Sequence, residues 1–470
     1  MPYVLGIDVG FDRTAAAVCQ LDGAPETSDT AVAVVALDER SSTVESALYL
    51  ERDGSIVVGD AAAQHALLDH RRLARGFVAR MGDDVPLVIA GQQYLPQDLA
   101  AALVTWVVDQ ARARYGDPAE HVVVTHPGNW GPYRRSVLGG ALHQFGLDNV
   151  TLLPASVAAA EGLAGGDLLA VYHLGEDSVE ASVVRRRHTG PFQLLGRVQG
   201  GGAVSADDTL VELVAGELAS GGSAAGGSSA AGGLAAADPT DPRARSAMRQ
   251  LRRECVAAKE ALSTASAEAE VDAEVAIEVP PALTPGWRGE VRVARRQFER
   301  RIEPALRVTV DALDRAVRSA AVDPRQLDAV LLVGGPCRLP AVADQVRARF
   351  PVPIAADADP ALTVARGAAL VARRVLSPPS PRPVPQPRTP TPAALDEPPP
   401  RPPVRISPLE LPRPRQVPRL VSDRPVVFSA LVTMLVLTIG VALTFFLSDG
   451  FAQPAAPLPA PFTAPPAAGR

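Results

Sequence analysis

The sequence has few aromatic residues, few cysteines and little net charge, and these shortages exclude several classes of protein. Aromatic residues make up 4% of the 470-residue chain, in which Ala, Val, Leu and Pro are the main apolar residues. Cys19, Cys255 and Cys337 are odd in number and far apart, so they form neither a disulfide framework nor a metal-ligand spacing, which fits a reducing compartment. The formal net charge of −6 is mild for this length and indicates no general affinity for nucleic acid.

Two further features are missing. The seven histidines never fall at ligand spacing with cysteines or carboxylates, so their pattern assigns no metal site. The first ten residues, MPYVLGIDVG, have neither a basic n-region nor a cleavage site, so we expect no signal peptide.

One long apolar run, Val426–Leu447, carries no charge. As a helix that rises about 1.5 Å per residue, it spans the roughly 30 Å hydrocarbon core of a bilayer. A buried core helix would need a domain around it, and none surrounds this run. Arg413, Arg415, Arg419 and Arg424 precede the run while Asp449 follows it, which predicts a cytoplasmic N-terminal part. The sequence therefore predicts a single-pass cell-membrane protein in contact with lipid, with a short, disordered extracytoplasmic tail at 448–470.

A proline-rich linker is predicted at 377–425, where proline occupies 18 of the 49 positions. Proline removes backbone donors and fixes φ, so this segment is expected to be a semi-extended spacer without helix or sheet. We interpret it as a tether. The stretch Pro381–Pro392 could alternatively be a ligand for an unknown protein partner, or carry a phosphorylated threonine.

Residues 1–376 alternate buried strands with helical patterns, which favours an α/β domain. A Gly/Ala/Ser-rich run at about 220–237 is interpreted as a flexible insertion. The predicted strands are Tyr3–Asp8, His121–Thr125, Leu168–Tyr172 and Ala329–Val333, and the predicted helices are Leu99–Tyr115, Pro132–Phe145, Ser156–Leu163, Ser246–Ala265 and Pro340–Phe350.

Two of the predicted strands run into glycine turns. The first ends in Asp8-Val9-Gly10, which places a carboxylate and a tight turn at the edge of a sheet. Backbone amides of such a turn can bind phosphate, and the carboxylate can hold Mg²⁺ through water. Another strand runs into Gly334-Gly335, where a base or sugar could approach the backbone closely. A plain hairpin turn explains the first motif equally well.

Taken in order, the segments of residues 1–375 resemble the seventy-kilodalton heat-shock chaperones, of the actin/hexokinase-like ATPases. The adenosine loop, Ala329–Phe350, is the most specific match. The resemblance implies a two-lobed actin-like ATPase fold with duplicated mixed sheets and helices, which binds ATP or ADP with Mg²⁺. No segment resembles the substrate-binding domain and lid of these chaperones. The other matching segments are Gly6–Val18, His121–Leu147, 152–163, 168–184, Arg253–Thr264 and 359–370.

The resemblance assigns roles to individual positions. Asp8 and Ser178 correspond to catalytic positions, and Asp8 also to the residue on the Mg²⁺ side. Pro127 and Arg135 correspond to a relay between the lobes. The nucleotide-binding positions are Gly10, Lys259, Ser263, Gly334, Gly335 and Arg338.

Several positions depart from the family pattern. Val78 stands where the family has a lysine, with Arg80 nearby, while Pro154 replaces a glutamate and His173 an aspartate. Because phosphoryl transfer depends on positioned charges around the phosphate, hydrolysis is expected to be impaired. Whether a nucleotide still binds stays open at this point. Further departures are Phe11, Asp12, Glu176, Asp177, Glu260 and Pro336.

These observations favour a degenerate chaperone-type domain that acts as a nucleotide-sensing or scaffolding module at the inner membrane face. The alternative is an active ATPase with altered site residues that assists protein folding. A third hypothesis is an actin-like polymerising protein, although no sequence feature specifies a longitudinal contact.

Overall fold

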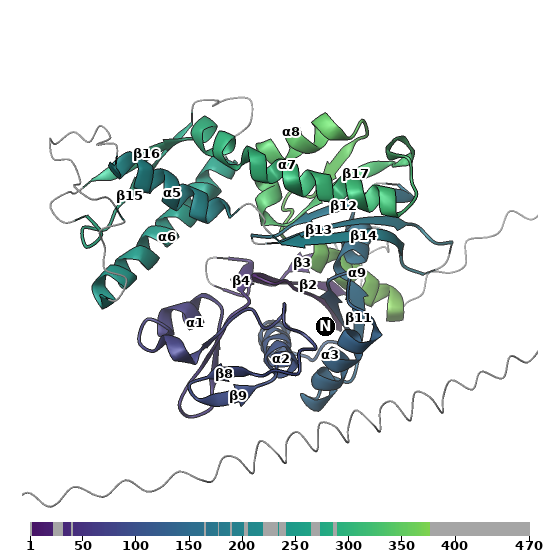
Figure 1. The fold of residues 1–470 in the computed structure, drawn as a ribbon. Coiled ribbons are helices and arrows are strands. Elements are labelled where there is room, and N and C mark those ends of the chain that lie inside the picture. The colour runs from purple at the N-terminus through teal and green to yellow at the C-terminus, as the bar shows by residue number, and fades with distance from the viewer. Residues whose placement is uncertain are drawn as a thin grey trace, which may run out of the picture. The chain divides into compact units, whose positions relative to one another are not determined.

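The computed structural model describes residues 2–21, 32–38, 41–163, 166–176, 178–188, 190–201, 205–219, 234, 241–264, 273–284 and 289–376 (Figure 1). The chain divides into two units, Met1–Val384 and Pro385–Arg470, and every described residue belongs to the first. The predicted linker, transmembrane run and tail lie outside the described residues. Of the helices in the described part, none has the length and hydropathy required to cross a bilayer.

Two large mixed sheets organise the first unit, and they share one pattern of strands. In each, an antiparallel hairpin pairs along its first strand with a parallel strand, which pairs with a second parallel strand. The first sheet has the order β11-β10-β1-β2-β3, with β4 also on β2, and the second has the order β18-β17-β12-β13-β14. The first contains β1 (Tyr3–Val9), β2 (Arg13–Gln20), β3 (Val32–Val34), β4 (Thr43–Glu45), β10 (Val122–His126) and β11 (Val150–Pro154). The second contains β12 (Leu168–Leu174), β13 (Ser178–Arg185), β14 (Gln193–Gly201), β17 (Ala329–Val333) and β18 (Ile354–Ala356).

Helices cover both faces of these sheets, which explains why their central strands are mainly apolar and are buried along almost their whole length. Between the sheets lie α4 (Ala155–Gly162) and α9 (Thr363–Leu376), in a core to which both sheets contribute (Figure 1). The outer face of the first sheet packs on α2 (Pro96–Tyr115) and α3 (Pro132–Gln144). The outer face of the second sheet packs on α7 (Arg295–Ser319) and α8 (Pro340–Arg349).

The remaining described elements form smaller subdomains around this frame. One is a hairpin, β15–β16, beside α5 and α6, and another is the small sheet β6-β5-β7 beside α1. The elements are α1 (Asp60–His65), α5 (Ala206–Ala219), α6 (Pro242–Thr264), β5 (Leu48–Leu50), β6 (Ile56–Val58), β7 (Leu73–Ala74), β8 (Leu87–Ile89), β9 (Gln92–Tyr94), β15 (Glu274–Glu278) and β16 (Glu290–Ala294), with 3₁₀ turns at His70–Arg72, Pro324–Gln326 and Gly335–Arg338.

The predicted mixed α/β organisation is confirmed, and the repeated sheets fit the two-lobed actin-like fold that the resemblance implies. Helices α2 and α6 begin three and four residues earlier than their apolar periodicity predicted. Each begins with a proline, whose missing N–H costs nothing at the first helical position. Of the run at about 220–237, Leu234 is described, and it is buried in the core of the second sheet; the other residues of the run lie outside the described part.

Candidate functional site

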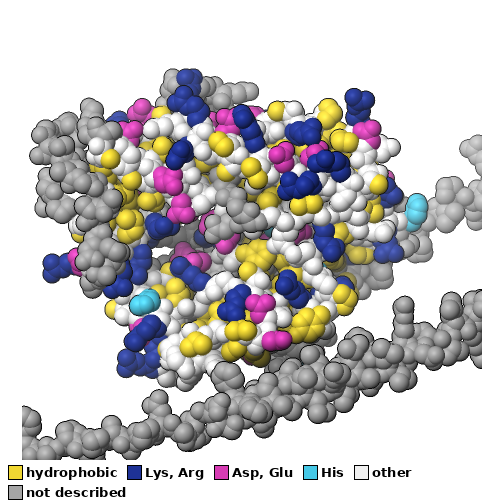
Figure 2. Space-filling view, viewed as in Figure 1, with side chains coloured by type: hydrophobic (Ala, Val, Ile, Leu, Met, Phe, Trp, Pro, Cys, Tyr) yellow, Lys and Arg dark blue, Asp and Glu magenta, His cyan; other side chains and the backbone are white. Residues whose placement is uncertain are grey.

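A cavity of about 1250 Å³ opens where strands of the two sheets end. Its lining includes the residues at or just after the carboxyl ends of β1, β10, β12 and β17. Ligands of α/β proteins bind at such strand ends, and the volume is ample for a small molecule. Figure 2 shows basic and acidic side chains interspersed over one face of the molecule, without a patch of one sign that would mark a binding surface there. A candidate site is therefore expected among the residues that line the cavity.

Two hairpin turns of the same form face the cavity, one from each sheet. In the β1–β2 turn, the amide of Gly10 donates to the carbonyl of Arg13 at 3.1 Å. In the β12–β13 turn, the amide of Gly175 donates to the carbonyl of Ser178 at 2.8 Å. The Asp8–Gly10 turn closes a hairpin, as the plainer interpretation of the motif predicted, and the same turn also lines the cavity. Asp177 of the second turn lies outside the described residues.

Two buried carboxylates lie at the base of the cavity. Asp8, at the end of β1, is 8% exposed and accepts a hydrogen bond from the Thr125 hydroxyl at 2.6 Å. Glu180, on β13, is 9% exposed, and both of its oxygens accept from the Gly128 amide at 3.1 Å. Because Gly128 follows β10 and Glu180 belongs to the other sheet, this bond links the two halves of the site.

Burial dominates the protonation of both carboxyls. Desolvation raises the pKa of Asp8, and the nearby His173 and the Thr125 hydrogen bond oppose this change. Desolvation likewise raises the pKa of Glu180, against His173 and the Gly128 amide. His173 thus acts on both carboxyls, and it lies opposite Glu180 in the β12–β13 pairing. The position that the sequence assigned to a lost carboxylate therefore carries an imidazole between two acids.

Sequence reasoning missed a second histidine in the lining, His126 at the end of β10. Its ring stacks on Trp130 with centroids 5.6 Å apart, and its Nδ1–H donates to the Pro127 carbonyl at 2.8 Å. Burial lowers the pKa of His126, so the ring is neutral. Its Nε2 is buried without a hydrogen-bond partner in the described part of the chain, and is an acceptor with no donor. The signal available in the sequence was the histidine directly before the Pro127 turn.

The predicted adenosine-side residues also line the cavity, but their side chains are engaged within the protein. Lys259 Nζ lies 2.7 Å from Asp207 Oδ1 and 3.6 Å from Glu176 Oε1. The Ser263 hydroxyl donates to the Lys259 carbonyl at 2.7 Å. Arg338 pairs with Asp359, with Nη2 at 2.5 Å from Oδ1.

Glycine is required at the turn after β17. Gly334 has a φ of 96°, and a side chain there would collide with the carbonyl of Leu174 in the β12–β13 turn. This close approach brings the two turns of the second sheet together at the cavity. Gly335, which begins a 3₁₀ turn, has open space around its Cα.

Three positions that the sequence connected with catalysis do not line the cavity, although Pro154 adjoins the lining residues His126 and Ala155. Val78 is 2% exposed in the core of the first sheet, and Pro154 ends β11, opposite His126 in the strand pairing. Arg80, expected to stand near the lost lysine, points elsewhere, because it pairs with Asp83 at 3.3 Å and donates to the Val85 carbonyl at 2.7 Å. None of the three is among the described residues that line the cavity.

The structure brings most of the predicted site residues together. Arg135, on α3, is outside the described lining, whereas its predicted relay partner Pro127 is within it. Within the described ranges, no group of three or more His, Cys, Asp or Glu side chains is arranged to hold a metal ion. The predicted residues in the lining are Asp8, Gly10, Pro127, Ser178, Lys259, Ser263, Gly334, Gly335 and Arg338.

Comparison with known proteins gives a consistent set of relatives. The family model for the Hsp70 protein matches residues 72–382, a range that begins after the Gly10–Arg13 turn and includes the other turns of the cavity. The chain is 27% identical over 388 residues to the chaperone protein DnaK of Elusimicrobium minutum, covering 79% of this chain and 58% of that protein. It is 28% identical over 394 residues to the chaperone protein HscA homolog of Azotobacter vinelandii, covering 78% and 57%. The chain thus spans less than two thirds of the length of these relatives.

Proposed function

The chain belongs to the Hsp70 family, and we propose that its globular unit binds an adenine nucleotide, hydrolyses it negligibly, and acts as a nucleotide-sensing or scaffolding module at the inner face of a membrane.

The observation that carries the proposal is the set of residues around the two hairpin turns. A side chain that stabilises a transferring phosphoryl group must carry charge into the cavity. Val78 instead packs in the core, and Pro154 lies outside the described lining. His173 does face the cavity, but between Asp8 and Glu180. These contacts leave Asp8 and Ser178 as the family positions that could still serve the reaction.

Nucleotide binding is supported by the volume and by the glycine turns. The ends of four strands surround a space of about 1250 Å³, and the close contact of Gly334 with Leu174 leaves backbone, rather than side chains, at one wall. Gly334, Gly335 and Ser263 would hold the adenosine portion, and the Gly10 turn the phosphates. Mg²⁺ would be held mainly by the phosphates, with Asp8 reaching it through water. The bound ion would neutralise phosphate charge.

The membrane part of the proposal rests on the sequence. The uncharged run Val426–Leu447, with the arginines before it, supports a lipid-embedded anchor and a globular unit on the cytoplasmic side. The proline-rich segment 377–425 would tether the unit and offers a site for a protein partner.

Single-turnover cleavage of γ-labelled ATP by the purified full-length chain in detergent tests the catalytic part. Losing one preorganised electrostatic contact costs on the order of 10²–10³ in rate. We therefore expect cleavage at least roughly 100-fold slower than that of an active family member assayed beside it. Asp8→Asn serves as the control for contaminating ATPase activity, which the substitution would leave unchanged. Cleavage at the rate of the active member, lost in Asp8→Asn, would instead identify an active ATPase, as the alternative hypothesis requires.

A further inference from the structure

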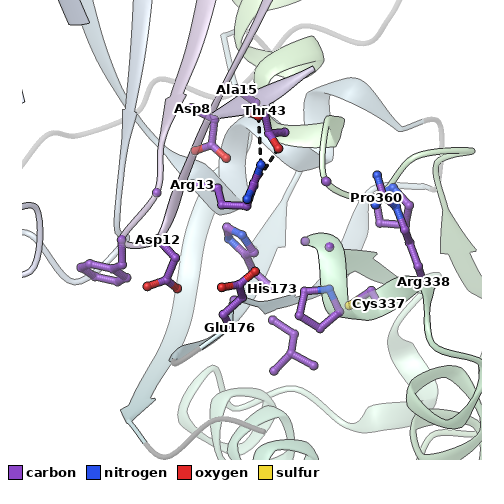
Figure 3. Close-up of a pocket in the computed structure, with 18 of the residues that line it drawn as sticks. Asp8, Asp12, Arg13, Ala15, Thr43, His173, Glu176, Cys337, Arg338 and Pro360 are labelled. Atoms are coloured by element: carbon purple, nitrogen blue, oxygen red, sulfur yellow. Dashed lines mark hydrogen bonds between the residues drawn. The ribbon is translucent and has the colours of Figure 1, made fainter. Parts of the chain in front are cut away.

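Arg13 is a cavity-lining cation that no family motif pointed to. It is the first residue of β2, directly after the Gly10 turn, and it is half-buried. Its Nε donates to the Thr43 hydroxyl at 2.8 Å and its Nη2 to the Thr43 carbonyl at 3.0 Å. In Figure 3 the guanidinium points toward Thr43, with Asp8 beside it and with His173 and Glu176 on the other side of the Arg13 side chain.

Two cations on the adenosine side, Lys259 and Arg338, differ from Arg13 in their partners, whereas Arg253, which also lines the cavity, is exposed on α6. Lys259 is paired with Asp207 and Glu176, and Arg338 with Asp359, so their charges are largely matched within the protein. The hydrogen bonds of Arg13 to Thr43 go to a hydroxyl and a carbonyl, which are neutral acceptors. Glu45, opposite Arg13 in the strand pairing, pairs with Arg75 at 2.8 Å and interacts more weakly with the charge of Arg13.

The balance of charge near the two turns makes such a cation necessary for an anionic ligand. Asp12 and Glu176 line this end of the cavity, and their carboxylates repel phosphate, while the buried Asp8 and Glu180 add to this repulsion whenever they are ionised. A guanidinium binds phosphate with two parallel hydrogen bonds and stays charged at every physiological pH. Thr43 accepts from one N–H of Nε and one of Nη2, which leaves both N–H groups of Nη1 and the second one of Nη2 for a ligand and fixes the plane of the guanidinium.

We propose that Arg13, held by Thr43, is the phosphate-binding cation of this cleft and makes it select nucleoside di- and triphosphates over the nucleoside. The family has a lysine at the position of Val78, which here is an uncharged side chain buried in the core. Arg13 supplies the positive charge from the first hairpin instead. The inference rests on the proposed nucleotide binding and adds to it the residue that sets specificity for the phosphate chain.

Calorimetric titration of the full-length chain in detergent tests this assignment, with MgATP, MgADP and adenosine as the probes. Loss of a charge-assisted hydrogen bond predicts that Arg13→Ala weakens ATP and ADP binding roughly 10- to 100-fold and leaves adenosine affinity unchanged. Arg13→Gln, which can still bond to Thr43, should lose the same affinity without any change in folding. Arg80→Ala removes an arginine of the same half that faces away from the cavity, and it should bind all three ligands as the wild type does.

The outcomes separate the two proposals. Unchanged ATP affinity in Arg13→Gln, or equal loss of ATP and adenosine, would overturn the role of Arg13 while nucleotide binding stands. If the wild-type protein binds adenosine as tightly as ATP, the role of Arg13 in selecting the phosphate chain is likewise overturned. If the wild type binds none of the three ligands, both proposals fail.

Discussion

At the scale of single residues, the site is governed by buried acids that face each other across the two sheets. Glu180 is held by the Gly128 amide, and Gly128 has no room for a side chain, because an added Cβ would lie 2.8 Å from Glu180 Oε1. Burial raises the pKa of Glu180, so the folded protein keeps a proton on this carboxyl at a pH where the unfolded chain has lost it. The ionised form is therefore the costly one in the folded state.

Glu180→Gln should accordingly change how stability depends on pH. The wild type has the full contribution of this group below the unfolded pKa and loses it as pH rises through the raised pKa of Glu180. The variant, which is neutral at every pH, should gain stability relative to the wild type as the pH rises above the ordinary glutamate pKa of 4.5. Burial also raises the pKa of Asp8, so the stability of the variant should still fall to some extent as the pH rises.

Thermal unfolding of the full-length chain across this range measures the effect. The matched control is Glu278→Gln, which neutralises an exposed carboxylate on β15 and should follow the wild-type curve. The prediction would be contradicted if the difference in unfolding temperature between Glu180→Gln and the wild type stayed constant, or narrowed, as the pH rises.

At the scale of elements, α9 carries the join between the two halves of the fold. It packs against β1, β2, β10 and α4, and glycines allow the close approach. A Cβ on Gly367 would collide with the carbonyl of Ala158 in α4, and a Cβ on Gly6 of β1 would collide with the backbone of α9. Backbone atoms on both sides leave no flexible side chain to move aside.

Gly367→Ala should therefore destabilise the protein although alanine favours helix. Overpacking typically costs about 1–3 kcal/mol, and this site belongs at or above the upper end because the collision is with backbone. The control is Gly140→Ala in α3, where nothing lies within 4 Å of the added Cβ. That substitution should stabilise by about 0.5–1 kcal/mol. Chemical denaturation of the two variants and the wild type measures the free energies of unfolding. If both substitutions change this free energy equally, or if Gly367→Ala is as stable as the wild type, then α4 and α9 can separate at little cost.

At the scale of the whole molecule, the described unit and the C-terminal segment are distinct. The boundary near Val384 falls within the proline-rich stretch, after α9 ends at Leu376. The membrane proposal concerns residues beyond that boundary, and its physical basis is the length of the uncharged run and the asymmetry of arginine around it.

Protease added outside intact cells should remove only a short C-terminal piece. The tail at 448–470 would be exposed on that side, while the globular unit would be protected by the membrane. Immunoblotting with tags at both termini provides the measurement, and detergent permeabilisation provides the control, because it should expose the whole chain. Digestion of the N-terminal tag in intact cells would show the opposite orientation to the one predicted. An undigested C-terminal tag would argue against a membrane span.

Local sequence determined several elements of this protein. Strand β17 is a continuous apolar run because both faces of its sheet are covered, and it has the predicted bounds. The order of these strands and their glycine turns was sufficient to identify the family. Local pattern did not predict β2, β13, α7 or α9, which complete the sheets and their packing. The hairpin partners and helices of that packing are specified by contacts with segments far away in the chain.

Only the tertiary structure decided which side chains face the cleft. Arg13 and Arg80 are equally plausible cations in the sequence, yet one lines the cavity and the other pairs with Asp83. Lys259 matches its family position, but Asp207 and Glu176 determine what its charge contacts. The physical reason is that a side chain's direction and partners depend on elements brought together from distant parts of the chain, whereas periodicity and spacing carry only local information.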